Sequence, residues 1–150
     1  MLPVKDGVIV VPNSWMICLP RPDMEHCIKI GKFGMKLPRV INSVKEGDRV
    51  ACYVSKEARV IALGKAVRPY YKGKAAVFLA NGMFEHRFDF SAEVLKNEVD
   101  FRALTSRLKL TRGSNSWGPV LRLGLVRLAD DDFDLIVKEA AALRKAGQKA

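Results

Sequence analysis

The chain has 150 residues, of which 49% are hydrophobic and 28% are charged. This length and composition are typical of one globular domain, so we expect residues 1–150 to form a single domain and exclude a disordered chain and a long coiled coil. The formal net charge of +10 indicates an anionic partner, such as nucleic acid or a membrane surface.

The cysteine pattern and the apolar runs bear on the compartment. Cys18, Cys27 and Cys52 are odd in number and form no Cys-x-x-Cys pair, which argues against a disulfide framework and a structural zinc site and favours a reducing, cytoplasmic setting. The longest uncharged run, residues 7–20, is interrupted by Pro12 and is shorter than the about 20 apolar residues that a membrane-spanning helix needs. We therefore expect no membrane segment, and no signal peptide.

The first part of the chain predicts a strand, a helical turn and a loop. Trp15 to Leu19 is a short apolar run between turn-forming residues, which is typical of a buried strand, and we expect it at the centre of a sheet. Asp23 is a candidate cap for a helical turn over residues 24–28, which must end before Gly31. Residues 32–40 are expected to form a loop.

The next segments predict three further strands. Arg49 to Val54 and Val60 to Val67 have β-rich compositions, and we expect them to pair in antiparallel fashion, with Gly64 at a bulge. Aromatic and polar residues alternate from Phe84 to Phe90, which is the period of a half-buried strand. The alternate residues of this strand, including His86, are expected to share one face.

The last third of the chain predicts helices. Phe101, Leu104 and Leu108 lie at helical spacing, and a stretch rich in glycine and serine follows at residues 113–118. The clearest prediction is a final helix that begins with three aspartates at residues 130–132 and carries an apolar stripe. Several short strands with two or three helices make an α+β domain, or a small barrel with helices packed on it.

Positive charge is concentrated in three stretches without acidic residues. These stretches hold 16 of the 26 Lys and Arg residues, are interleaved with aromatic residues, and comprise residues 26–45, 58–84 and 101–129. Cations release counterions from phosphates, and an aromatic face adds about 1–3 kcal/mol per stacked base, so the pattern favours nucleic-acid binding. Solvated surface charges with the aromatic residues in the core remain the alternative. A membrane-surface role is disfavoured because the one strong helix begins with aspartates.

The sequence contains no recognisable catalytic motif. Neither a phosphate-binding P-loop nor a nucleophile elbow is present. His26 and Cys27 are a single pair of candidate ligands, which we interpret as a local contact rather than a metal site. His86 has no nucleophile at catalytic spacing, so we interpret it as structural. We expect no enzyme, no metal and no cofactor. A small-molecule pocket, in which His86 is a general base, and a protein-interaction module with an acidic partner remain alternatives.

Several short motifs occur in an order that resembles EVE domains. They are an early strand beginning with Trp15, the aromatic-Gly-hydrophobic stretch Phe33-Gly34-Met35, the Val-Lys-x-Gly-Asp turn at residues 44–48, His86-Arg87, Trp117, and the Asp-Phe-Asp-Leu-Ile run at residues 132–136. The resemblance spans nearly the whole chain and is closest to small, stand-alone archaeal and bacterial members. It implies a PUA-like fold: a curved, mostly antiparallel barrel with helices around it and a pocket that receives a nucleic-acid base.

The resemblance also implies a function and a site. EVE domains are similar to YTH domains, which hold a methylated adenine in an aromatic cage, and they are thought to recognise modified bases in DNA or RNA. It implies that Phe33, Gly34 and Met35 line the pocket wall, with Trp15 and Trp117 near the same cavity.

Our hypothesis is therefore a non-catalytic reader of a flipped or unpaired base, on which Phe33 and Trp117 stack. Phosphate contacts are assigned to Lys32, Lys36, Arg39, Arg112 and Arg122. The sequence leaves open the choice between DNA and RNA, the base modification and the oligomeric state.

Overall fold

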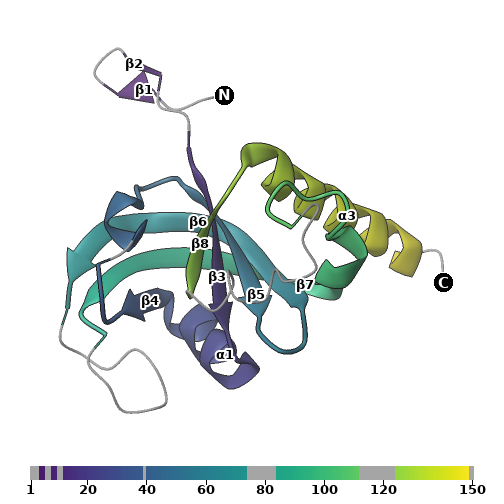
Figure 1. The fold of residues 1–150 in the computed structure, drawn as a ribbon, viewed down its shortest axis with the longest axis horizontal. Helices are drawn as coiled ribbons and strands as arrows, with labels where there is room; N and C mark the ends of the chain where they lie inside the picture. Colours follow the sequence, from purple (N-terminus) through teal and green to yellow (C-terminus); the bar gives the residue numbers. More distant parts are fainter. Residues whose placement is uncertain are drawn as a thin grey trace.

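The structure, a computed structural model, describes residues 4–5, 8–9, 12–38, 40–73, 84–111 and 124–148. Within these residues it is an α+β fold in which a curled, six-stranded sheet is flanked by two α-helices (Figure 1). The predicted fold class is confirmed.

The six-stranded sheet has the order β4-β7-β6-β5-β3-β8. Its strands are β3 (Ser14–Leu19), β4 (Lys32–Met35), β5 (Arg49–Val54), β6 (Arg59–Lys72), β7 (His86–Asp100) and β8 (Leu125–Leu128). All neighbours are antiparallel except β3 and β5, which are parallel. A separate antiparallel pair is formed by β1 (Val4–Lys5) and β2 (Val8–Ile9).

The helical elements cover the sheet and connect its strands. They are α1 (Arg21–Ile30), the 3-10 helix η1 (Val40–Ser43), the 3-10 helix η2 (Phe101–Leu104) and α3 (Asp130–Gln148). No helix among the described residues is long and apolar enough to cross a membrane.

Strand β3 separates two hydrophobic cores. Because successive side chains of a strand point to opposite faces, Trp15 and Ile17 enter the core that contains α1 residues, while Met16 and Cys18 enter the core that contains α3 residues. All four side chains are buried. The strand is second from the edge of the sheet rather than at its centre, since only β8 lies beyond it; its burial comes from the two cores.

The strand predictions hold in part. Residues 49–54 form β5 with the predicted bounds, paired in antiparallel fashion with β6. The predicted bulge at Gly64 is wrong, because Gly64 pairs regularly with Ala92, and a Cβ at Gly64 would lie only 1.9 Å from the carbonyl oxygen of Ser91. The glycine permits close strand contact, and the register of β6 and β7 shifts elsewhere, including between Arg68 and Tyr71.

Two local predictions need correction near the first helix. The helix α1 is longer than the turn expected, and Asp23 lies in its first turn, where its charge favours the helix dipole, while the N-cap position is Pro20. The helix ends at Gly31, whose φ of 71° suits glycine. Residues 32–35 form β4 rather than a loop because they pair with β7.

The helical predictions of the last third have different outcomes. The final helix begins at Asp130, as predicted. The helical spacing of Phe101, Leu104 and Leu108 corresponds to η2 and a following turn, and all three side chains are buried in the core on the α3 side.

Candidate nucleic-acid interface

The predicted pocket-wall residues make up most of β4. This strand pairs with the beginning of β7, so that Gly34 lies opposite Arg87 and Met35 lies opposite His86. The sheet continues on the far side of β7 with β6, in which Lys72 lies opposite His86. Met35, His86 and Lys72 therefore lie side by side at one end of three neighbouring strands.

The structure brings Trp15, Phe33 and Met35 together in one core cluster, but it buries both rings. Phe33 is 1% exposed and makes an edge-on contact with Phe88, their ring centroids 5.8 Å apart. Trp15 is also 1% exposed, and its Nε1 donates a hydrogen bond of 2.8 Å to Oδ2 of Asp48. The open stacking face expected of Phe33 is thus replaced by core packing, because pairing with β7 turns this side chain inward.

The space beside Gly34 is filled by the chain itself. A Cβ at this position would lie 2.8 Å from the carbonyl oxygen of Phe84 and 3.1 Å from its Cβ. The glycine therefore allows the residues just before β7 to pack closely on β4. This differs from the open pocket wall that the resemblance implies at Gly34.

Met35 is half-buried and lies where the two edge strands of the curled sheet approach each other. A Cβ built at Gly124, just before β8, would be 3.9 Å from Cε of Met35. The carbonyl of Gly124 accepts a 2.8 Å hydrogen bond from the backbone N–H of Cys18. Met35 is the one predicted pocket-wall residue of β4 whose side chain is partly exposed at this junction.

A tyrosine and a histidine are hydrogen-bonded beside Met35. The hydroxyl of Tyr70 lies 2.6 Å from Nδ1 of His86, and Nε2 of His86 lies 3.6 Å from a carboxylate oxygen of Glu85. His86 shares its strand face with the buried Phe88, as the alternation predicted, and is itself 6% exposed. We call Met35, Tyr70 and His86 the mouth of the sheet.

The opposite face of the same strands carries a charged network. Nζ of Lys32 donates hydrogen bonds to the hydroxyl of Tyr71 at 3.3 Å and to the carboxylate of Asp89 at 3.2 Å, and both bonds raise the pKa of Lys32. The Tyr71 hydroxyl in turn donates a hydrogen bond to Asp89 at 2.5 Å. Burial and this bond raise the pKa of Tyr71. The guanidinium of Arg68 lies 3.6 Å from the centroid of the Tyr71 ring.

Two of the three acid-free stretches converge here. Lys32 and Lys36 come from the first stretch, and Arg68 and Lys72 come from the second; β7 holds the two segments together. Lys36, Arg68 and Lys72 are exposed, and Nζ of Lys36 lies 5.4 Å from the centroid of the Phe84 ring. Lys36 and Lys72 adjoin the mouth, since one follows Met35 in the chain and the other lies opposite His86. Lys32 and Arg68 lie on the opposite face of the same strands. Together the four cations raise the positive potential at this end of the sheet.

The other predicted site residues are not placed. Arg39, Arg112, Trp117 and Arg122 lie outside the described residues. Lys109, which belongs to the third acid-free stretch, forms an ion pair of 2.8 Å with Asp131 of α3. Its charge is therefore partly neutralised within the protein.

Sequence reasoning did not assign roles to Tyr70, Tyr71, Arg68 or Arg87. Arg87 is 4% exposed, and its Nε donates a 2.9 Å hydrogen bond to the carbonyl of Phe84. The Pro-Tyr-Tyr-Lys run at residues 69–72 was a signal, since it places two aromatic residues directly beside a basic one. Its two tyrosines lie on opposite faces because successive side chains of a strand alternate, and the register shift between Arg68 and Tyr71 decides which of them faces the mouth.

Comparison with protein-family models and with curated proteins gave no match. Solved structures do match. A hypothetical protein from Leishmania major is 14% identical, with 89% of this chain and 98% of that chain covered and a TM-score of 0.65. The human THYN1 protein, solved in complex with DNA containing 5-methylcytosine, is 14% identical over 85% of this chain and 97% of that chain, with a TM-score of 0.60. The Mmi1 YTH domain is 10% identical over 92% of this chain and 99% of that chain, with a TM-score of 0.62.

The chain has a PUA-like fold. The agreement extends over nearly the full length of these proteins, so it concerns the whole sheet with its helices rather than one motif. Sequence identities of 10–15% establish the PUA-like architecture alone. Among the described residues of this PUA-like domain, no group of three or more His, Cys, Asp or Glu side chains gathers as a metal site.

Proposed function

We propose that this chain is a non-catalytic nucleic-acid-binding domain of the EVE type, which accepts a modified base of DNA or RNA at the mouth. The proposal is supported by the shared fold with a protein solved in complex with 5-methylcytosine-containing DNA and with a YTH domain. The observation that carries it for this chain is the position of Lys36 and Lys72 next to the mouth, with Lys32 and Arg68 on the opposite face of the same strands.

The chemistry of the mouth suits a flat heterocycle. Met35 offers a polarizable thioether, which packs favourably against aromatic rings. The bonded pair of Tyr70 and His86 offers polar atoms to a base edge, and the pair is held in place by its 2.6 Å hydrogen bond. A methyl group on the base adds apolar surface to this contact, which favours the modified over the unmodified base.

The cations supply the phosphate contacts. Lys36, Arg68 and Lys72 are exposed, while Lys32 is held beside Tyr71 and Asp89 and contributes a fixed charge. Arg39, Arg112 and Arg122 keep their predicted phosphate roles, and Trp117 keeps its predicted stacking role. Phe33 and Trp15 support the wall from within the core. We place the protein in the cytoplasm, since its Cys18, Cys27 and Cys52 are free thiols.

The proposal is tested by fluorescence anisotropy with matched single-stranded oligonucleotides that do or do not carry 5-methylcytosine or N6-methyladenine, as DNA and as RNA, across a salt series. We expect tighter binding to one modified oligonucleotide and a linear fall of log affinity with log salt. Met35→Ala should reduce the preference for the modified base without changing the salt slope, because it removes no charge.

The rival functions predict other results. A small-molecule pocket predicts no oligonucleotide binding at any salt concentration. A protein-interaction module predicts that Met35→Ala has no effect on a salt-sensitive complex with an acidic protein. Equal, undetectable binding to every oligonucleotide contradicts the proposed function.

A further inference from the structure

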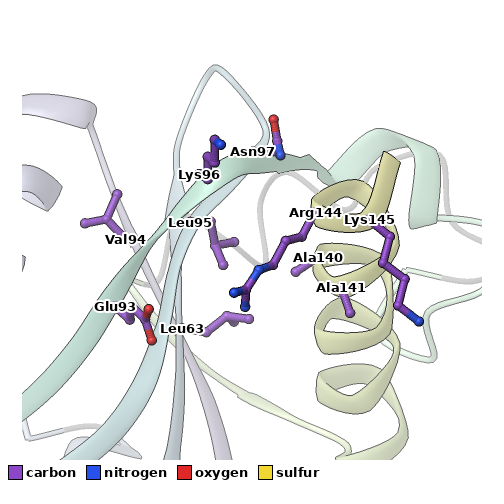
Figure 2. Close-up of a pocket in the computed structure, with 10 residues that line it drawn as sticks. All are labelled: Leu63, Glu93, Val94, Leu95, Lys96, Asn97, Ala140, Ala141, Arg144 and Lys145. Atoms are coloured by element: carbon purple, nitrogen blue, oxygen red, sulfur yellow. The ribbon is translucent and has the colours of Figure 1, made fainter. Parts of the chain in front are cut away.

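A second hollow lies between α3 and the sheet, well away from the mouth. It has a volume of about 690 Å³ and is bounded by Leu63 of β6, by residues 93–97 of β7 and by the second half of α3 (Figure 2). Glu93 is seven residues after His86, roughly 23 Å along an extended strand. The hollow and the mouth are therefore separate, so each can bind a ligand whether or not the other is occupied.

The floor and one wall of this hollow are aliphatic. Figure 2 shows Leu63 and Leu95 on the sheet facing Ala140 and Ala141 on α3. Val137, which is 41% exposed, precedes these alanines by three and four positions and so extends the same stripe of the helix. The leucines and Ala140 are only half-buried, which leaves apolar surface uncovered.

The rim of the hollow is positively charged. Lys96, Arg144 and Lys145 line it against a single acid, Glu93. In the part of the chain that the structure describes, none of these three cations is within ion-pair distance of a carboxylate. Figure 2 shows the side chain of Arg144 extended from α3 across the hollow toward Leu63. A guanidinium above aliphatic side chains has two parallel donors ready for a carboxylate.

The dimensions of the hollow suit a short peptide. Five residues of β7 and the helical stretch from Val137 to Lys145 each span about 12 Å, which corresponds to about four residues of extended chain. The aliphatic floor lacks aromatic side chains on which a nucleic-acid base stacks. The charge balance on the rim selects an acidic occupant over a basic one.

We propose that this hollow is a docking groove for a partner protein, which inserts a short segment with an aliphatic side chain next to an aspartate or glutamate. The aliphatic side chain covers Leu63 and Leu95, and the carboxylate pairs with Arg144. The domain then has two independent binding sites. Nucleic acid binds at the mouth, and the partner protein binds toward the other end of β7.

The groove is tested by selecting short random peptides displayed on phage against the full chain, with Ala141→Glu as the counter-selected protein. The glutamate at position 141 is helix-compatible and places a carboxylate three residues before Arg144, where it competes with the ligand. We expect enriched peptides that combine an aliphatic residue with a neighbouring acid. Their synthetic versions are then titrated by anisotropy and by chemical-shift mapping.

Matched variants of α3 decide the outcome. Arg144→Glu should weaken peptide binding about tenfold or more, while Lys138→Glu, with the same change in charge on an exposed position outside the groove, should change it less than about twofold. The proposal is overturned if no peptide is enriched over the counter-selection, if the enriched peptides lack acids, or if Arg144→Glu binds them normally. It is also overturned if oligonucleotides displace the peptides and shift the resonances of groove residues, because the groove then binds phosphates rather than a peptide.

Discussion

The hydroxyl of Tyr70 and Nδ1 of His86 lie 2.6 Å apart, and this contact joins β6 to β7 at the mouth. The next residue, Tyr71, instead reaches Asp89 on the opposite face of β7. The shift of register between Arg68 and Tyr71 thus assigns one tyrosine to the mouth and its neighbour to the outer charged network.

The two tyrosines form a matched pair for mutation. Tyr70→Phe removes one hydrogen bond at the mouth, so we expect it to weaken binding of the preferred modified oligonucleotide by about 1 kcal/mol with an unchanged salt slope. Tyr71→Phe should leave the preference for the modified base intact. Anisotropy with paired modified and unmodified oligonucleotides measures both effects, and an equal loss of preference in the two variants would contradict the assignment of Tyr70 to the mouth.

The cations at this end of the sheet should determine the salt dependence. Lys36→Ala and Arg68→Ala each remove one phosphate contact, so each should reduce the slope of log affinity against log salt by about 0.7–0.9. Lys138→Ala removes the same charge from α3 and should leave the slope unchanged. If the three variants behave alike, the charge acts through the whole surface, and the cations at this end of the sheet have no special role.

Asp48 should be a strong determinant of stability. Its carboxylate, which is 2% exposed, accepts hydrogen bonds from Nε1 of Trp15 and from the backbone N–H groups of Asn13 and Lys45. Asp48→Ala leaves these donors without their acceptor and should lower the free energy of unfolding by about 3 kcal/mol. Glu46→Ala, an exposed neighbour, should change it by less than about 0.5 kcal/mol in the same urea titration. Equal effects would show that the Asp48 bonds are dispensable.

The three cysteine thiols should be unreactive in the folded protein. Burial raises the pKa of Cys18 and of Cys27 to about 12, and it raises that of Cys52 still further above the usual value. Because the thiolate is the reactive form, iodoacetamide at about pH 8 should leave the native protein unmodified while it alkylates the urea-unfolded chain. Mass spectrometry counts the alkylated thiols; rapid modification of the native protein would mean that these side chains are accessible.

An ion-pair network on α1 should give a pH-dependent contribution to stability. The guanidinium of Arg21 pairs with Glu57 at 2.8 Å and with Glu98 at 2.9 Å, and its hydrogen bonds hold the pKa of Glu57 below the ordinary value of 4.5. A lowered folded-state pKa stabilises the fold above the unfolded-state pKa, and this contribution is lost as the pH falls through the folded-state value. Arg21→Gln should therefore lower Tm at pH 7, and the difference should shrink below about pH 4.5. A Tm difference that grows on acidification would contradict this.

The elements with strong local signals were predictable from the sequence. The final helix has aspartates at its start and a continuous apolar stripe, and residues 49–54 are a run of strand-forming side chains with a turn before them. In these segments the local preference and the tertiary packing agree. The basic stretches also indicated the charge character of the site, although not which cations come together.

The remaining features depend on contacts between distant residues. Phe33, Gly34 and Met35 are too few to signal a strand, and they form β4 only by pairing with β7. Trp15 carries no local sign that Asp48, in a turn after η1, will accept its indole N–H. The sharing of Asp89 between Lys32 and Tyr71 likewise requires the order of β4, β7 and β6 in the sheet, which no local pattern contains.

The most direct test of where this domain binds nucleic acid is a two-dimensional NMR titration with the preferred modified oligonucleotide. We predict the largest chemical-shift changes at Met35, Tyr70 and His86, with smaller changes at Lys36 and Arg68 and none along α3. Changes confined to α3, or changes spread evenly over the surface without saturation, would contradict binding at the mouth.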